Sequence, residues 1–194
     1  MAPLIAASSQ RFGSRGTLLI GTFLTFLALF GASYSTQIYQ LILSQGICFG
    51  WGLGFLYITA TAVLPQWFST HRSLATGLAA SGAGLGGIVY NLLAGSLVEK
   101  IGVSWTYRVL AFCALAANLI ASVLIRDRNA SVRPSRKAFD HSEYRRIEVL
   151  LVMVWGFATE LGYVVLLYSL PNYATSIGLS THQGSVVGAL LNLG

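Results

Sequence analysis

Charged residues are scarce in this sequence, and their scarcity excludes several classes of protein. Aspartate, glutamate, lysine and arginine together make up 9% of the 194 residues, whereas hydrophobic residues make up 55%. A soluble domain carries about 25% charged residues, so an ordinary water-soluble fold is excluded. The net charge of +6 does not indicate a nucleic-acid partner either, because the basic residues lie between apolar runs instead of along one exposed face.

Residues that bind metals or perform catalysis are also few. Cys48 and Cys113 lie in uncharged apolar runs, where a cysteine behaves as a small hydrophobic residue. The three histidines, His71, His141 and His182, lie in separate segments without an acidic or cysteine cluster at ligand spacing. We therefore predict no metal, no cofactor and no enzymatic activity.

Uncharged apolar runs, in contrast, are abundant. A bilayer core about 30 Å thick needs about 20 consecutive apolar residues in a helix. Such runs predict transmembrane helices at about residues 16–35, 38–63, 73–98, 105–125 and 149–170, followed by a partial helix at 183–194. The predicted fold class is all-α, a polytopic membrane protein surrounded by the lipid bilayer. Because the last run is shorter than a span, we expect the chain to be an incomplete piece of a larger helix bundle.

The segments between these runs differ in charge, and the difference predicts the orientation. One set of alternate segments contains ten of the twelve basic residues, and loops rich in lysine and arginine lie on the cytoplasmic side. The largest of them, residues 126–148, is predicted to be a polar cytoplasmic loop. It separates the helices of residues 1–125 from those of residues 149–194.

Two polar features are interpreted from this orientation. Asn129-Ala-Ser131 matches a glycosylation acceptor, but we predict no glycan because the segment lies on the cytoplasmic side. Arg108 lies just inside the outer end of the fourth span, where its long side chain can extend to the lipid headgroups.

Small residues recur at three- and four-residue spacing in two of the predicted helices. Such faces let a neighbouring helix approach closely. The positions are Gly46, Gly50 and Gly54 in the second span and Gly77, Ser81, Gly82, Ala83 and Gly86 in the third. Residues 82–87 also match the pattern GxGxxG, but a dinucleotide site requires a preceding strand and a later acidic residue. We therefore predict helix packing here and no nucleotide binding.

Glu160 is the polar residue that points most directly to function. A carboxylate near the centre of a span costs a few kcal/mol or more to place there ionised, which favours its protonated form and makes a proton-carrying role reasonable. Gly156 and Tyr163 share its helical face as candidate cavity lining. The alternative is a protonated carboxyl group that hydrogen-bonds a neighbouring helix for structure alone. Asn91 and Gln45 are further cavity candidates, although amides inside spans also bridge helices.

Residues 67–86, WFSTHRSLATGLAASGAGLG, resemble the signature of the monocarboxylate-porter branch of the major facilitator superfamily. That signature joins an aromatic-Phe pair, a basic cluster and Leu-Ala-x-Gly-x-Ala followed by spaced glycines. Residues 10–15, QRFGSR, are similar to the Asp-Arg-x-Gly-Arg-Arg loop of the superfamily, with Gln10 at the acidic position. The resemblance implies a role in cytoplasmic gating loops for three arginines, Arg11, Arg15 and Arg72.

Residues 162–193 look like the fungal members of this branch. The resemblance implies helices three to seven of a larger carrier, with fragments of helices two and eight, in the plasma membrane. It also implies transport of a small organic solute, a monocarboxylate or related metabolite, with proton coupling or export as variants. The alternative that stays open is a truncated, transport-inactive membrane protein or a partner subunit of another carrier.

Overall fold

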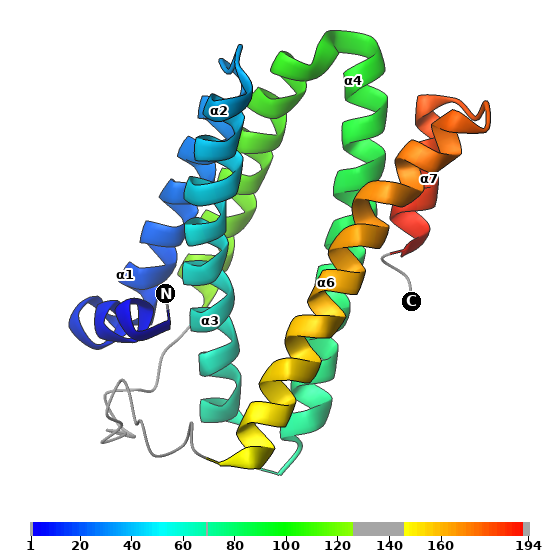
Figure 1. The fold of residues 1–194 in the computed structure, drawn as a ribbon. Helices are drawn as coiled ribbons and strands as arrows, with labels where there is room; N and C mark the ends of the chain where they lie inside the picture. Colours follow the sequence, from blue (N-terminus) through cyan, green and yellow to red (C-terminus); the bar gives the residue numbers. More distant parts are fainter. Residues whose placement is uncertain (1, 69, 126–145, 192–194) are drawn as a thin grey trace. The chain divides into compact units, whose positions relative to one another are not determined.

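The computed structural model describes residues 2–68, 70–125 and 146–191 (Figure 1). These residues form helices joined by turns, and the described ranges contain no strand, which confirms the all-α prediction. Four of the described helices are long and apolar enough to cross a membrane. The chain is a polytopic helical membrane protein.

The first helix, α1 (Ala2–Ala32), is interrupted at a single residue. Gly13 has φ 72° and ψ 170°, a left-handed conformation that glycine adopts readily because it lacks a Cβ atom. The chain therefore turns here without a loop, whereas the sequence predicts a connection over residues 10–15. The apolar part of α1 ends at Ala32, three residues before the predicted end.

The second span consists of three consecutive elements, α2 (Ile38–Leu41), η1 (Ile42–Cys48) and α3 (Phe49–Trp67). The element η1 is a π-helix, in which the hydrogen bonds reach one residue further than in an α-helix; at its end, the amide of Phe49 donates to the carbonyl of Ser44. The helix continues through Pro65 and ends at Trp67, four residues beyond the predicted end.

The 53-residue helix α4 (Arg72–Leu124) contains the two predicted spans 73–98 and 105–125. A straight helix of this length would measure roughly 80 Å, more than twice the thickness of a bilayer core. Gly102 breaks it with φ 78° and ψ 170°. The expected connection at residues 99–104 is therefore a single-residue break, and α4 supplies enough helix for two passes.

The remaining described helices are α6 (Ile147–Ser176) and α7 (Thr181–Leu191). The sequence predicts that the first of them ends before Pro171, but α6 continues through this proline for one more turn. Gly178, with φ 92°, lies in the short connection to α7. The predicted cytoplasmic loop at residues 126–148 lies mostly outside the described residues.

The chain divides into two compact units. The first comprises Met1–Ala80 and Lys100–Arg136, and the second comprises Ser81–Glu99 and Lys137–Gly194. Helix α4 thus contributes residues to both units. The division of the chain into residues 1–125 and 149–194, which the sequence predicts from the polar loop, stays a prediction.

In the first unit, α1 packs closely along α3. A Cβ atom on Gly52 would lie 2.6 Å from Cγ2 of Thr25, and one on Gly21 would lie 2.9 Å from Cβ of Phe55. Only glycine permits this approach of the two backbones. The hydroxyl groups of the buried Thr22 and Thr25 donate to carbonyls of their own helix, so their burial leaves these groups paired.

The close approach on this span lies at Gly52 and not at the glycines that the sequence analysis selects. A Cβ atom on Gly46 would meet only Ile42 of its own helix, at 3.8 Å. Added Cβ atoms meet nothing within 4 Å at four of the other selected positions, Gly50, Gly77, Gly82 and Gly86. The described residues therefore supply no close neighbour there, and the packing role of these glycines, together with Gly54, stays a prediction.

Candidate functional site

Two of the three arginines of the predicted gating loops bind carbonyl groups at helix ends. In the first unit, Nε of Arg15 donates to the carbonyl of Ile125 at 3.0 Å, and Nη2 donates to that of Val123 at 3.3 Å. Nε of Arg72 donates to the carbonyl of Phe68 at 3.1 Å, at the C-terminus of α3. The last carbonyls of a helix lack partners within it and carry partial negative charge. Both arginines therefore act as C-terminal caps.

Arg11 has a different environment from the other two arginines. Its Cζ lies 5.8 Å from the ring centroid of Phe12, which is a contact with its own neighbour in sequence. The three arginines therefore do not form one cluster in the described residues, and their role in gating stays a prediction.

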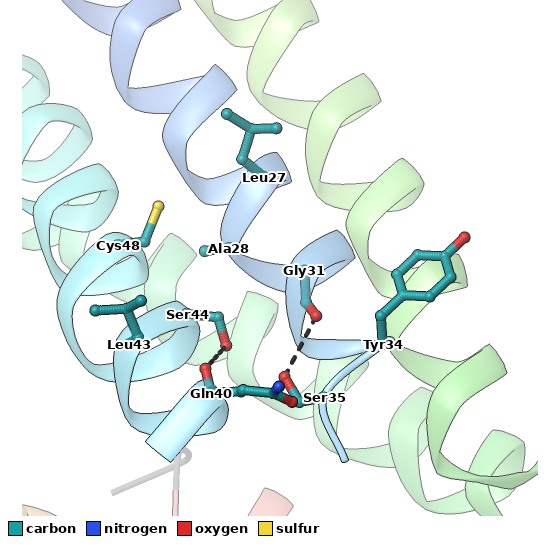
Figure 2. A pocket seen from close by; sticks show the side chains of 9 residues that line it. All are labelled: Leu27, Ala28, Gly31, Tyr34, Ser35, Gln40, Leu43, Ser44 and Cys48. Carbon is teal, nitrogen blue, oxygen red and sulfur yellow. Dashed lines mark hydrogen bonds between the residues drawn. The ribbon is translucent and has the colours of Figure 1, made fainter. Parts of the chain in front are cut away.

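A hollow in the first unit lies between α1 and the start of the second span (Figure 2). Its volume is about 390 Å³, within the size range of small-ligand sites, and its lining residues are Leu27, Ala28, Gly31, Tyr34, Ser35, Gln40, Leu43, Ser44 and Cys48.

The two serine hydroxyls of the hollow are directed to the backbone of their own segments. The hydroxyl of Ser44 donates to the carbonyl of Gln40 at 2.8 Å, and that of Ser35 donates to the carbonyl of Gly31 at 3.3 Å, as Figure 2 shows. Both serine hydroxyls are therefore already paired, and the leucine and alanine side chains of the lining suit an apolar group. Gln45, the predicted cavity residue of this span, is not one of its lining residues.

Glu160 and Tyr163 lie on α6, in the second unit, three residues apart and so on one helical face. Both side chains are exposed, Tyr163 to 40%. A carboxylate within a transmembrane helix faces protein or a water-filled cavity, not lipid. This face of α6 therefore requires polar surroundings beyond its own helix.

Asn91, on the part of α4 that belongs to the second unit, lies beside α7. Its Nδ2 donates to the carbonyl of Gly87 at 2.9 Å within its own helix. Its Oδ1 would lie 3.6 Å from a Cβ atom on Gly188, which would also lie 3.6 Å from Cγ of Pro171 on α6. Asn91 therefore packs against α7 at a glycine. The sequence analysis misses Gly188, although its spacing of four from Gly184 is the signal that could have revealed it.

Gln45 belongs to the first unit and Asn91, Glu160 and Tyr163 to the second. The described residues contain no group of three or more histidine, cysteine, aspartate or glutamate side chains that could hold a metal ion. The described residues thus show paired helix ends and polar residues within spans.

Comparisons with known proteins agree with this picture. The family model described as Major Facilitator Superfamily matches residues 1–194. "Probable transporter MCH2" of Saccharomyces cerevisiae is 34% identical over 200 residues, which cover 100% of this chain and 42% of the relative. An "MFS-type transporter" of Gibberella moniliformis is 31% identical, with 98% of this chain and 46% of the relative covered.

A third relative, "Fujikurins efflux protein" of Gibberella fujikuroi, is 32% identical over 132 residues, which cover 68% of this chain and 28% of the relative. No solved structure matches the chain. The chain spans less than half the length of these curated relatives.

The match over the full sequence, together with the membrane-spanning helices, confirms the resemblance seen at residues 10–15 and 67–86. The chain belongs to the major facilitator superfamily of membrane transporters.

Proposed function

We propose that this chain contributes to a secondary carrier that moves a small organic solute, a monocarboxylate or related metabolite, across the plasma membrane. The observation that carries the proposal is the family match over residues 1–194. Carriers of this kind bind solute near the midplane and expose it alternately to the two sides by rocking one half against the other. No covalent chemistry is needed.

Proton coupling through Glu160 is the second part of the proposal. Glu160 lies near the middle of α6, and an ionised carboxylate at such a depth is costly. A carboxyl group that is neutral when it faces an apolar environment and ionised when it faces water can take up a proton on one side and release it on the other. Tyr163, on the same face, is the second residue of α6 that we expect to contact solute or water.

The test is uptake of radiolabelled lactate by proteoliposomes that contain the purified chain, with and without an inward proton gradient. We expect the gradient to increase uptake in the wild type and to have no effect in Glu160→Gln. The matched control is Glu148→Gln, because Glu148 is an exposed carboxylate of the same helix in its first turn. This control should respond to the gradient as the wild type does.

The possible outcomes separate the two parts of the proposal. Full, gradient-dependent uptake by Glu160→Gln would contradict the proton role and leave the carrier function intact. No lactate movement by the wild-type chain, in either direction, would contradict a carrier function of this chain on its own and favour a transport-inactive membrane protein or a partner subunit of another carrier. Because one relative is named as an efflux protein, the assay includes vesicles loaded with lactate.

A further inference from the structure

Arg108, in the part of α4 that belongs to the first unit, lies close to two aromatic rings. Its Cζ is 4.6 Å from the ring centroid of Tyr34 and 4.7 Å from that of Trp105. A guanidinium at these distances is attracted electrostatically to the ring faces. Its Nε also donates a long hydrogen bond of 3.4 Å to Oγ of Ser33. These contacts hold the half-buried Arg108 against the C-terminal end of α1.

The contacts of Arg108 leave its charge without a counter-ion in the part of the chain that the structure describes. The carboxylates of that part are Glu99, Glu148 and Glu160, and the interactions of Arg108 there are the two ring contacts and the bond to Ser33. A cation at the edge of the apolar layer is stabilised when an anion pairs with it. The attraction between the guanidinium and the two rings supplies only part of the stabilisation that a paired anion would give.

The guanidinium of Arg108 also has N–H groups left that can donate hydrogen bonds to a ligand. A guanidinium has five N–H groups in one plane, and the bond to Ser33 uses the one on Nε. Attraction to the ring faces does not occupy the N–H groups on the two terminal nitrogens. Those nitrogens can donate side by side to two oxygen atoms of one carboxylate or phosphate group.

We propose that Arg108, Tyr34, Trp105 and Ser33 form a binding site for an oxyanion at this end of the first unit. The ligand is an anion with two neighbouring oxygens, either the carboxylate of a solute or the phosphate of an anionic lipid headgroup, whose charge no choline group neutralises. The sequence predicts this end to be on the outer side of the membrane. A solute carboxylate at this site rests on the proposed carrier function, whereas a lipid phosphate does not.

The position of Tyr34 agrees with this arrangement. Tyr34 follows the C-terminus of α1 and also borders the hollow. In Figure 2 its side chain points away from Gln40 and Ser44, which line the other side of the hollow. Its ring is therefore directed outward from the hollow and over Arg108.

Trp105 provides a direct spectroscopic signal for ligand binding, because its ring lies against the guanidinium. A chain in which Trp51, Trp67 and Trp155 are replaced by phenylalanine retains Trp105 as its single tryptophan. We would place this chain in phosphatidylcholine nanodiscs and titrate it with sodium lactate while recording the tryptophan emission. A parallel sample contains phosphatidylglycerol in the nanodisc and no lactate.

For a solute site, we expect a saturable change in emission with lactate and no comparable change with neutral lactamide or with sodium chloride at equal ionic strength. For a lipid site, we expect the change in phosphatidylglycerol nanodiscs without lactate. In either case Arg108→Gln should weaken apparent affinity at least tenfold, and Arg108→Lys should bind more weakly than the wild type but better than Arg108→Gln.

Equal responses of the wild type to lactate, lactamide and chloride, or no response to lactate and phosphatidylglycerol, would overturn the site. These outcomes need no substitution of Arg108, so they hold even if Arg108→Gln does not fold. Transport without anion binding at Trp105 would leave the carrier function intact. Lactate binding without transport would support the site and contradict the carrier function.

Discussion

The guanidinium of Arg15 and the carbonyl of Ile125 are joined by a hydrogen bond of 3.0 Å that connects residues 110 positions apart in the sequence. Ile125 is the C-cap residue of α4, and the carbonyl of Val123 accepts a second bond from Arg15 at 3.3 Å. The arginine therefore links the start of the long part of α1 to the end of α4 in the first unit. Through this link, a residue of one predicted cytoplasmic loop stabilises the end of α4, which leads into another predicted cytoplasmic loop.

Replacing Arg15 by alanine should loosen the end of α4. The lost interactions with helix C-terminal carbonyls amount to about 1 kcal/mol or less, because the pair is exposed. We expect amide hydrogen exchange of residues 121–125 to become faster by a factor of about 5 or less, the equivalent of that free energy. The measurement is hydrogen–deuterium exchange of the purified chain in detergent.

Arg11→Ala is the matched control for this prediction. Arg11 contacts the ring of Phe12, so its loss should leave exchange of residues 121–125 unchanged. Unchanged exchange in Arg15→Ala, or an equal increase in both variants, would show that the observed bonds do not stabilise the helix end.

Replacing Gly52 by alanine should destabilise the packing of α1 on α3. The added Cβ atom would lie 2.6 Å from Cγ2 and 2.8 Å from the backbone nitrogen of Thr25, and overpacking of this kind costs about 1–3 kcal/mol. We expect a lower midpoint of thermal unfolding, followed by circular dichroism in detergent. Gly50→Ala is the control, since its Cβ atom meets nothing within 4 Å.

Both substitutions gain the same helix propensity, so the difference between their midpoints reports packing alone. Equal midpoints for the two variants would contradict the close approach at Gly52.

Replacing Gly188 by leucine should displace α7 from its neighbours in the second unit. A Cβ atom there is already in contact with Oδ1 of Asn91 and Cγ of Pro171, both at 3.6 Å, so the rest of a leucine side chain needs space that these groups occupy. We expect faster hydrogen exchange across α7. Gly162→Leu, where the added Cβ atom meets nothing within 4 Å, should leave exchange in α7 as in the wild type.

Asn91 itself should contribute little to stability. Its hydrogen bond to the carbonyl of Gly87 is local, at 2.9 Å, and such bonds add about 1 kcal/mol. We expect Asn91→Ala to lower the unfolding midpoint only slightly. If Asn91 lines the solute cavity, lactate uptake should fall much more than stability does; equal losses of uptake and stability would contradict a cavity role.

The predicted orientation can be tested with cysteines in a background of Cys48→Ala and Cys113→Ala. Thr36, between α1 and α2, and His71, at the start of α4, are both exposed. We expect a membrane-impermeant maleimide to label Thr36→Cys in intact cells and His71→Cys only after permeabilisation, because loops rich in basic residues are cytoplasmic. The reverse pattern would invert the topology.

The sequence analysis and the structure agree best where composition decides the outcome. Apolar runs of about 20 residues satisfy their backbone hydrogen bonds as helices in a bilayer, and the described spans are helices. The differences lie at the connections. Gly13 and Gly102 turn the chain at single residues with positive φ, and an apolar helix tolerates Pro171 because a membrane helix can adjust locally around proline.

Packing is where reasoning from the sequence alone falls short. Glycine spacing identifies a face that permits close approach, but it does not say which face has a neighbour. On the second span the neighbour lies at Gly52, opposite Thr25, and the selected Gly50 faces open space. Likewise, the sequence indicates that Arg108 extends to headgroups, but it does not show that the side chain lies against two aromatic rings. One of these rings belongs to Tyr34, which follows the end of α1.

The sequence by itself determined that this protein is a helical membrane protein, because the length and hydrophobicity of its apolar runs are enough for that conclusion. Its resemblance to a transporter family depends on the motifs at residues 10–15 and 67–86. Only the tertiary structure decided that Arg15 caps α4, that Gly52 contacts Thr25, and that Arg108 lies against Tyr34. The physical reason is that each of these contacts joins different helices or the residues at their ends, and the rotation and depth of one helix against another depend on side-chain packing that no single helix encodes.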